Sequence, residues 1–354
     1  MKLLYGLNTP CLVVDYNILL KNIKAMSKFS KKSGVALRPH FKTHKCVEIA
    51  GLQIKHGALG ITCATIDEAE ALVQGGIKSI LIANQLTDEN KIKRLLKLQK
   101  RNNEIIIAVE NEDNLLLLNS LAKKAGKKIN VLVEVDTGMG RLGREPGADT
   151  LAFTLKVLSC KNMDFLGLMG YEGHTVFISG RKDRVKEAGR SLGLLTGTAK
   201  LLQGSGIPVK IVSAGGTGTY DIAGKFPGVT EMQAGSYVFM DEKYKKIIKG
   251  FNCSLFLLST VCGVRKDGYF ILDAGRKAVS SENGEPLVNG TPAEKLNEEH
   301  SKVRCSALQG RIVAGQKVLM TLTHCCTTVN LHDKLYVIKG NKGALRWKVH
   351  RCRL

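Results

Sequence analysis

The sequence predicts a parallel α/β barrel of the (β/α)8 TIM type, followed by an all-β domain. Eight short apolar runs alternate with longer helical patterns over the first two thirds of the chain. Eight such units in about 220 residues favour closure into a barrel, for which ~250 residues are usual. From about Phe251 the helical patterns give way to strand-like runs separated by turn signals. The carboxy-terminal part is therefore expected to fold as a separate β domain.

The apolar runs have the length of buried strands, and amphipathic segments separate them. Strands that are apolar on both faces and alternate with helices are typical of a parallel sheet covered by helices. An open doubly wound sheet is the competing architecture, but no G-x-G-x-x-G follows the first strand, where a dinucleotide-binding sheet carries it. The eight predicted strands are residues 35–40, 60–65, 80–84, 104–109, 130–135, 165–169, 209–213 and 231–234.

The tail contains a predicted hairpin. Strand-like runs at 254–264 and 269–272 flank the turn signal KDG at 266–268. Residues 10–15 form an additional strand ahead of the barrel, and we expect it to pair with the β domain. Further strands are expected at 317–323, 335–338 and 345–349. The predicted division is a barrel of residues 16–248 and a β domain made of residues 1–15 and 249–354.

Composition excludes several protein classes. The chain has 354 residues, of which 44% are hydrophobic and 24% charged, as in an ordinary globular protein. No uninterrupted apolar run approaches the ~20 residues that cross a bilayer, so no membrane association is expected. The amino terminus lacks the long apolar core of a secretory signal. Without such a signal, the ten cysteines indicate reduced thiols and a cytoplasmic location.

The charge balance raises the question of a nucleic-acid partner. Lysine and arginine number 53 against 31 acidic residues, which gives a net charge of +22. The basic residues are spread over most polar helix faces, and only 5% of residues are aromatic, so a stacking surface for bases is poorly supplied. We therefore expect solvated helix faces and no nucleic-acid partner.

Two glycine-rich loops follow the seventh and eighth predicted strands. In a parallel barrel the active site lies at the carboxyl ends of the strands, and these two loops often hold a phosphate. Glycine lets the backbone approach an anion closely, and threonine and serine hydroxyls add hydrogen-bond donors. Each loop alone is weak evidence, but both stand where the fold binds phosphate. The first loop is GGTGT at 215–219, and the second is Gly235-Ser236.

The first predicted strand ends in a segment that contains Lys42 and Lys45. A lysine at this rim can point into the barrel mouth, where burial and a neighbouring positive charge lower its pKa and allow Schiff-base formation. Both residues can equally be ordinary surface lysines in a lysine-rich chain. A phosphate site across the same barrel mouth favours the first interpretation, because a phosphate and a lysine imine together describe pyridoxal 5′-phosphate (PLP) binding.

Motifs along nearly the whole chain carry a family resemblance. The sequence resembles the metal-dependent D-threonine aldolases and D-serine dehydratases, which are fold-type III PLP enzymes related to alanine racemase. That resemblance implies an eight-stranded barrel that binds PLP and a β domain that completes the site, usually within a homodimer. The matching motifs are TPCLVVD (9–15), RPHFKTHK (38–45), TCAT (62–65), DTGMGRLG (136–143), GYEGH (170–174), SAGGT (213–217), QAGSY (233–237) and HCCTTVNL (324–331).

The resemblance implies a role for individual residues. Lys42 corresponds to the Schiff-base lysine, Arg141 to a residue near the phenolic oxygen of PLP, and Tyr171 to a residue near its pyridine nitrogen. A neutral partner at that nitrogen weakens the electron sink, which favours assistance by a metal ion. The phosphate would be held by Gly216, Thr217, Gly235 and Ser236, together with Tyr237.

His324 and Cys326 are the metal candidates. On an extended segment, an imidazole and a thiolate two residues apart point to the same side, which suits zinc. A histidine beside two cysteines is more often structural when taken alone, and the resemblance reverses that preference. Cys326 favours zinc, whereas a carboxylate at this position, as in some aldolases of the group, would favour manganese or magnesium. The adjacent Cys325 is expected to point away.

The implied activity is a lyase reaction on D-β-hydroxy-α-amino acids. In the aldolase version the Cα–Cβ bond breaks to give glycine and an aldehyde, and His40, His44 or a metal-bound water accepts the hydroxyl proton. In the dehydratase version Lys42 takes the α-proton, and D-serine gives pyruvate and ammonia. Residues 141–143, 233–237 and 327–333 resemble the D-threonine aldolase branch, whereas Cys326 with zinc resembles the dehydratase branch. An amino-acid racemase and a non-enzymatic PLP-binding protein are further alternatives.

Overall fold

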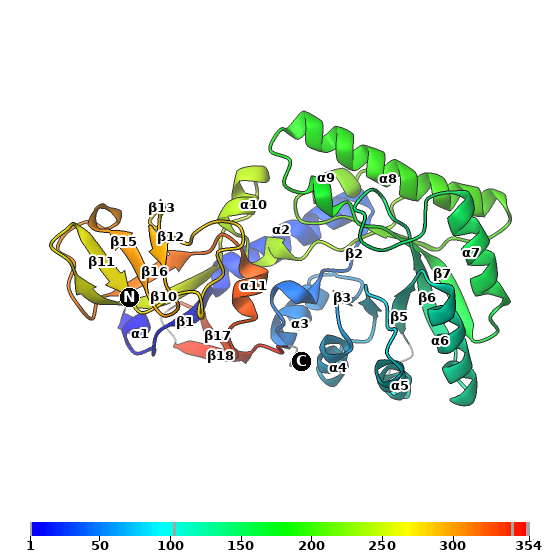
Figure 1. The fold of residues 1–354 in the computed structure, drawn as a ribbon, viewed down its shortest axis with the longest axis horizontal. Coiled ribbons are helices and arrows are strands. Elements are labelled where there is room, and N and C mark those ends of the chain that lie inside the picture. Colours follow the sequence, from blue (N-terminus) through cyan, green and yellow to red (C-terminus); the bar gives the residue numbers. More distant parts are fainter. Residues whose placement is uncertain (1, 102–103, 341–342, 352–354) are drawn as a thin grey trace. The chain divides into compact units, whose positions relative to one another are not determined.

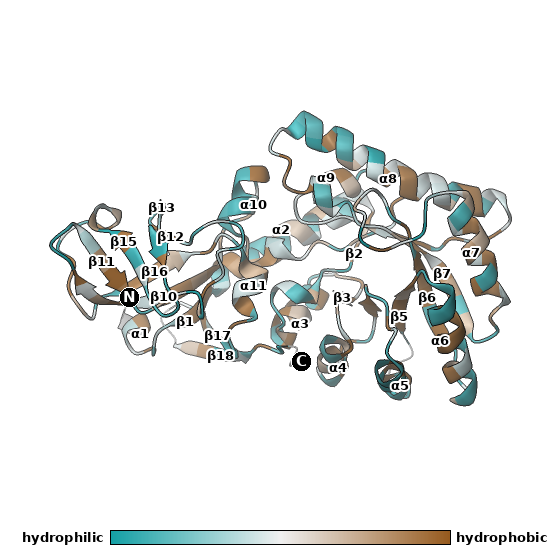
Figure 2. Cartoon of the chain, viewed as in Figure 1, coloured by the Kyte–Doolittle hydropathy of each residue, from teal (hydrophilic) through white to brown (hydrophobic). Residues whose placement is uncertain are grey.

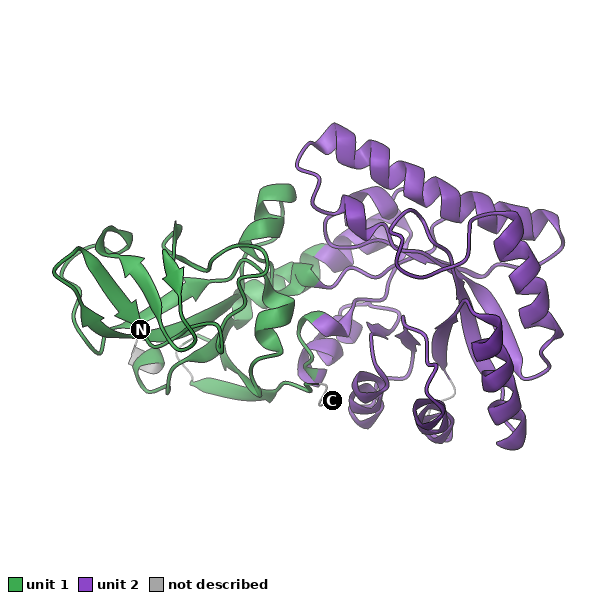
Figure 3. Cartoon of the chain, viewed as in Figure 1, with its two compact units in different colours: residues 1–25, 43–46, 236–354 green, residues 26–42, 47–235 purple. Residues whose placement is uncertain are grey.

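The computed structural model describes residues 2–101, 104–340 and 343–351, and the chain forms two compact units that interleave along the sequence (Figure 3). Unit 1 comprises residues 1–25, 43–46 and 236–354. Unit 2 comprises residues 26–42 and 47–235. No helix in the described parts of the chain combines the length and apolar character that a membrane span needs.

Unit 2 is built on an eight-stranded parallel sheet in the order β2-β9-β8-β7-β6-β5-β4-β3 (Figure 1). All eight strands predicted from the sequence are present, although several are shorter than expected. Their bounds are β2 Ala36–Leu37, β3 Ile61–Cys63, β4 Ile80–Ile82, β5 Ile105–Val109, β6 Ile129–Glu134, β7 Met163–Met169, β8 Ile211–Ala214 and β9 Glu231–Met232.

Backbone hydrogen bonds join the two ends of this sheet. Leu59 donates its backbone N–H to Leu37 O (2.8 Å), and Thr62 donates to Pro39 O (3.0 Å). A parallel bridge between His40 and Thr62 continues the contact beyond β2. The strands therefore close into a ring, which confirms the predicted alanine racemase-like barrel class.

Buried strands and amphipathic helices explain why this unit folds as a barrel. Every residue of β5 is at most 5% exposed, as expected for a strand covered on both faces. In Figure 2 β5 has the hydrophobic colour, whereas much of α5 is hydrophilic. The helices are α2 Tyr16–Ser33, which begins in unit 1, α3 Val47–Lys55, α4 Ile66–Gln74, α5 Glu89–Leu98, α6 Glu112–Lys124, α7 Ala148–Ser159, α8 Arg181–Gly204 and α9 Tyr220–Ala223.

Side-chain caps fix where three of these helices begin. Thr65 accepts a hydrogen bond from the third residue of α4, Asp88 does so for α5, and Asn111 for α6. Each cap satisfies one of the backbone N–H groups that a helix leaves without a partner at its start. The loops that follow β3, β4 and β5 end at these cap residues.

Unit 1 is a β domain that recruits the amino-terminal strand. β1 (Cys11–Asp15) pairs antiparallel with β10 (Leu255–Val264) and parallel with β17 (Lys334–Ile338). The predicted hairpin is present, because β10 pairs with β11 (Tyr269–Leu272) around the KDG turn. The remaining strands are β12 Leu287–Val288, β13 Thr291–Pro292, β14 Lys295–Leu296, β15 Ser301–Arg304, β16 Lys317–Thr321 and β18 Ala344–Lys348.

Short helices in unit 1 carry the remaining site candidates. Where the chain returns to unit 1 at residue 236, it forms the 3-10 helix η3 (Ser236–Val238) and then α10 (Glu242–Ile247). Helix α11 (Cys325–Val329) follows β16. Beyond these, α1 (Lys2–Tyr5) precedes β1, and the 3-10 helix η4 (Cys305–Ala307) follows β15. The nine cysteines within the described residues are thiols rather than disulfides.

Candidate active site

Lys42 and Arg141 lie over the ring of Tyr171 in unit 2. Lys42 is in the 3-10 helix η1 (Phe41–Thr43) that follows β2, Arg141 is in the loop after β6, and Tyr171 follows β7. Nζ of Lys42 is 5.7 Å from the ring centroid, and Cζ of Arg141 is 5.9 Å from it. Because parallel strands end at the same rim of a barrel, residues far apart in sequence meet here. The structure thus brings together the lysine, arginine and tyrosine selected from the sequence.

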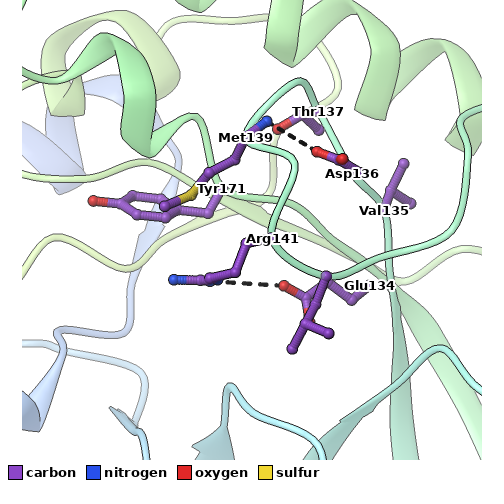
Figure 4. A pocket seen from close by; sticks show the side chains of 8 residues that line it. Glu134, Val135, Asp136, Thr137, Met139, Arg141 and Tyr171 are labelled. Atoms are coloured by element: carbon purple, nitrogen blue, oxygen red, sulfur yellow. Dashed lines mark hydrogen bonds and ion pairs between the residues drawn. The ribbon is translucent and has the colours of Figure 1, made fainter.

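Glu134, the last residue of β6, holds Arg141 (Figure 4). Its Oε1 is 3.8 Å from Nη2 of Arg141, and its Oε2 accepts a hydrogen bond from Nε2 of Gln85. Glu134 is only 4% exposed, and this burial raises the pKa of its carboxyl group, although Gln85 and Arg141 act in the opposite direction. A buried carboxylate with two partners is suited to fixing the direction of the arginine.

Asp136 shapes the loop that carries Arg141. Its Oδ1 accepts the backbone N–H groups of Gly138 and Met139, each at 2.9 Å, and that of Gly140 at 3.1 Å. The loop ends at Gly143, where φ is +115° and an added Cβ would lie 2.4 Å from the backbone nitrogen of Asp136. Glycine is therefore required at this position, and it closes the loop back onto the end of β6.

The glycine-rich loop after β8 wraps around the buried carboxylate of Glu172. Gly215 donates its backbone N–H to Oε2 (3.2 Å), and Gly216 donates to Oε1 (3.3 Å). The hydroxyl of Thr219 also donates to Oε1, and Glu172 is only 1% exposed. Glu172 therefore ties the loop after β7 to the loop after β8.

This link brings Tyr171 against the glycine loop. An added Cβ on Gly216 would lie 3.1 Å from Cε2 of Tyr171 and 3.3 Å from its hydroxyl oxygen. Contacts this short leave little room for a side chain on the loop. Gly216 therefore lets the tyrosine ring pack directly on the backbone.

The predicted phosphate ligands differ in their surroundings. The backbone N–H of Gly216 already donates to Glu172 and to Oγ1 of Thr219 (3.1 Å), while Thr217 beside it is 2% exposed. Gly235 is the last residue of unit 2. Ser236 and Tyr237 begin η3 in unit 1 and are 8% and 0% exposed.

The two candidate catalytic histidines are buried. In unit 2, Nδ1 of His40 accepts the backbone N–H of Lys42 at 3.3 Å. In unit 1, Nδ1 of His44 accepts the backbone N–H of Cys46 at 3.2 Å, and its ring packs edge-on against Phe239. When Nδ1 is an acceptor, a neutral imidazole carries its proton on Nε2. Both rings therefore present a donor at Nε2.

The segment that contains His324 and Cys326 is not extended throughout, so that part of the sequence prediction is wrong. His324 has extended backbone angles (φ −149°, ψ 122°), but it is the cap residue of α11, and the helix begins at Cys325. Side chains two residues apart point to the same side only in a strand, so this rule does not apply to His324 and Cys326. The imidazole and the thiol still interact, because the turn into the helix brings them together.

Two carboxylates flank the ring of His324. Nδ1 lies 3.7 Å from Oδ2 of Asp241, and Nε2 lies 3.9 Å from Oε2 of Glu282. Burial alone would lower the pKa of His324, but Asp241 and the thiol of Cys326 outweigh it and raise that pKa to about 10. The ring is therefore held in a strongly negative environment.

The two adjacent cysteines point to different surroundings. Sγ of Cys326 lies 3.4 Å from Oγ1 of Thr43 and 3.8 Å from Oγ of Ser236. Cys325 is fully buried, donates to Met240 O at 3.1 Å, and has a thiol pKa raised well above its usual range by burial. Of the two adjacent cysteines, Cys326 is partly exposed and Cys325 is buried.

The donor set around His324 fits a divalent metal. Imidazole and thiolate are ligands that zinc prefers. Two buried polar atoms beside them, Nδ1 of His324 itself and Oδ2 of Asp241, have no hydrogen-bond partner among the described residues. Within the described residues no group of three or more His, Cys, Asp or Glu side chains is arranged to hold a metal. The protein would thus supply two ligands and leave positions open, as catalytic metal sites do.

Comparison with known families matches both parts of the chain. Residues 14–243 match the family model for the amino-terminal domain of alanine racemase, and residues 254–338 match that for a putative serine dehydratase domain. A D-threonine aldolase from Arthrobacter sp. is 35% identical over 97% of this chain and 92% of its own length. The chain belongs to the D-threonine aldolase and D-serine dehydratase family of lyases.

Other relatives of this lyase family are similar along the whole chain. A 3-hydroxy-D-aspartate aldolase of Paracoccus denitrificans is 31% identical over 97% of this chain and 92% of its own. The crystal structure of D-threonine aldolase from Filomicrobium marinum has a TM-score of 0.93 and 30% identity, covering 98% and 96% of the two chains. A metal-free cysteine-to-alanine variant of D-threo-3-hydroxyaspartate dehydratase has a TM-score of 0.91 and 26% identity, covering both chains fully.

Sequence reasoning missed the buried carboxylates that support this lyase's site. Glu134 stands at the end of a predicted strand, where barrel enzymes place functional residues, and that position was an available signal. Glu172 is inside a quoted motif, but its partners lie more than 40 residues away in sequence. Asp241 caps α10 and contacts His324 only through tertiary structure.

Proposed function

We propose that the protein is a PLP- and metal-dependent lyase of the D-threonine aldolase type, which cleaves D-β-hydroxy-α-amino acids to glycine and an aldehyde. The observation that carries this proposal is the grouping of Lys42 and Arg141 around Tyr171 at the carboxyl ends of the barrel strands. It is supported by full-length similarity to proteins named D-threonine aldolase and 3-hydroxy-D-aspartate aldolase.

The residues around Tyr171 fit the cofactor. PLP, when bound, draws electrons from the α-carbon of an amino acid and weakens the bonds around it. Lys42 would hold it covalently, while Arg141 and Tyr171 would contact its ring. Glu134 keeps the guanidinium of Arg141 oriented, since the carboxylate is buried and bonded to Gln85. The proposed phosphate ligands remain Gly216, Thr217, Gly235, Ser236 and Tyr237.

His324 and Cys326 are the proposed metal ligands, and zinc is the ion that a thiolate and an imidazole favour. A divalent cation at these ligands supplies a Lewis acid that polarises the substrate hydroxyl. Both proposed metal ligands belong to unit 1.

Proton transfer in this proposal uses residues near Lys42. Once the substrate amine has displaced it from the cofactor, the amine of Lys42 would exchange protons with the substrate α-carbon, since its Nζ lies over the ring of Tyr171. His40 and His44 present Nε2–H as a donor, because Nδ1 of each ring accepts a backbone N–H. We therefore propose that these histidines donate hydrogen bonds from Nε2 rather than accept the hydroxyl proton.

A dehydratase reaction is the second candidate, and Cys326 is the observation that favours it. Thiolate ligands suit zinc, and the metal-free dehydratase structure that resembles this chain is a cysteine variant. In that reaction Lys42 removes the α-proton and the hydroxyl departs, which yields a keto acid and ammonia. The residues that bind the cofactor are the same in both cases.

Three further features belong to the proposal. The family resemblance supports a homodimer. The thiol state of the nine described cysteines supports a reducing compartment such as the cytoplasm. Zinc is proposed in preference to manganese or magnesium because one ligand is a thiol.

Product analysis tests the proposed reaction. Purified protein is incubated with PLP and either D-threonine or D-serine, with and without a chelator. We expect glycine and acetaldehyde from D-threonine, and a loss of at least 100-fold in rate when the chelator removes the metal. A keto acid and ammonia would instead establish the dehydratase, and unchanged rates after chelation would contradict the metal assignment.

The control is Lys42→Ala. We expect this variant to lose the visible absorbance of the lysine-bound cofactor together with activity, because the amine that lies over the ring of Tyr171 is removed. Lys45→Ala changes a lysine three positions away and should keep the absorbance. If Lys42→Ala retains the band, the cofactor assignment is wrong.

A further inference from the structure

Asp241 uses only one of its carboxylate oxygens to cap a helix. Oδ1 accepts the backbone N–H of Tyr244 at 2.9 Å and so begins α10. Asp241 itself is 1% exposed. Capping by Asn or Ser is about as effective as capping by Asp, so this role does not require a carboxylate.

The second oxygen of Asp241 points to the ring of His324. Oδ2 lies 3.7 Å from Nδ1, a separation too long for a hydrogen bond. Among the described residues neither atom has any hydrogen-bond partner, although both are buried. Leaving two buried polar atoms unsatisfied is costly, so a small rotation of the ring that joins them is favourable.

We infer that Asp241 is a positioning residue that orients His324 for metal binding by accepting a hydrogen bond from Nδ1–H. The inference rests on the metal site proposed above. With its proton held on Nδ1, the ring presents the lone pair of Nε2 to the metal. Nε2 faces the more exposed side of the ring, where the 56%-exposed side chain of Glu282 lies 3.9 Å away.

A carboxylate in this place strengthens a metal-binding histidine. It fixes the tautomer and the ring orientation and makes the ligating nitrogen more basic. Cys326 contributes the other protein ligand, so the site has few ligands and depends strongly on how well each is oriented. Loss of such a supporting carboxylate weakens metal affinity by about 10–100-fold.

The test is Asp241→Asn, which retains the helix cap and removes the charge. The affinity of the full-length protein for Zn²⁺ is measured by competition with a chelating dye. We expect the dissociation constant to rise about 10–100-fold while the melting temperature of the metal-free protein stays within about 2 °C. Nitrogen NMR of the His324 ring should show the Nδ1–H tautomer depleted in the variant.

Asp88→Asn is the matched control, because Asp88 caps α5 in the same way and belongs to unit 2, whereas His324 belongs to unit 1. It should leave zinc affinity unchanged. Asp241→Ser, a second variant that keeps a capping side chain, should reproduce the loss and covers the case in which the Asn variant folds poorly. Equal zinc affinity in wild type and in both Asp241 variants overturns the inference. If the wild type itself binds no Zn²⁺, the proposed metal site fails and the inference fails with it.

Discussion

At the scale of single residues, three buried carboxylates organise the candidate site. Glu134, Glu172 and Asp241 are 4%, 1% and 1% exposed, and each contacts a residue selected from the sequence or the loop that carries it. A buried carboxylate is costly unless it has partners, so such groups persist where they fix other groups in place. Glu134 gives the clearest consequence for pH.

The raised pKa of Glu134 makes folding stability depend on pH. Above the unfolded-state value of 4.5 the folded protein retains a proton that the unfolded chain releases. Stability from this group is therefore fully present below pH 4.5 and is lost as the pH rises through the folded-state pKa. Glu134→Gln, which cannot ionise, should lose less stability between about pH 4.5 and pH 7 than the wild type does.

Urea unfolding at several pH values measures this difference. Glu48→Gln, a change at an exposed glutamate on α3, is the control and should keep the wild-type slope. The same pH slope in Glu134→Gln and wild type would contradict the assignment of a raised pKa to Glu134.

At the scale of an element, the long helix α8 contains glycines that no packing requires. An added Cβ at Gly193 or Gly197 meets no atom within 4 Å, and both positions are exposed. Glycine inside a helix costs roughly 0.5–1 kcal/mol relative to alanine, because it loses more backbone freedom on folding. Helix α8 is consequently less stable than a helix of the same length with alanine at these two positions would be.

Replacing these glycines should stabilise the protein. We expect Gly193→Ala and Gly197→Ala each to raise the free energy of unfolding by about 0.5–1 kcal/mol, as measured by urea denaturation. Gly216→Ala makes the same chemical change where the new Cβ meets Tyr171 and Val176, and it should lower stability by about 1–3 kcal/mol. A loss of stability in both α8 variants would show that these positions need glycine for a reason other than space.

At the scale of the whole molecule, the net charge of +22 lowers the stability of the folded state relative to the unfolded chain. Like charges on a folded surface repel, and the unfolded chain spreads them farther apart. Salt screens such repulsion, since the Debye length falls from about 30 Å at 0.01 M to about 10 Å at 0.1 M.

Sodium chloride should therefore stabilise this protein near neutral pH. We expect the melting temperature at pH 7 to rise by about 1–2 °C between ~0.01 M and ~0.2 M salt, on the scale of a change below ~1 kcal/mol. Near pH 9.6, the isoelectric point, the net charge is close to zero and the effect should disappear. A melting temperature that falls with salt at pH 7 would mean that favourable ion pairs outweigh the repulsion.

Most of the secondary structure followed from local patterns. The eight barrel strands and the β10–β11 hairpin were predictable because apolar periodicity and turn residues act over a few positions. The strands β12, β13, β14 and β15 of unit 1 were not predicted, and three of these four have only two residues. The extended geometry expected at His324 failed where α11 begins, since the start of a five-residue helix leaves almost no signal in the sequence.

By itself, the sequence determined the fold class, the family and the identities of the lysine, arginine, tyrosine, histidine and cysteine candidates, because these depend on motifs and local periodicity. Tertiary structure alone decided which groups support them. Glu134 meets Arg141 and Gln85, Glu172 meets the glycine loop, and Asp241 meets His324 across 83 positions of the chain. A buried carboxylate can fix the position of another group only after folding has removed its hydrating water and placed a hydrogen-bond donor beside it. These donors come from distant parts of the chain, so no local sequence pattern predicts them.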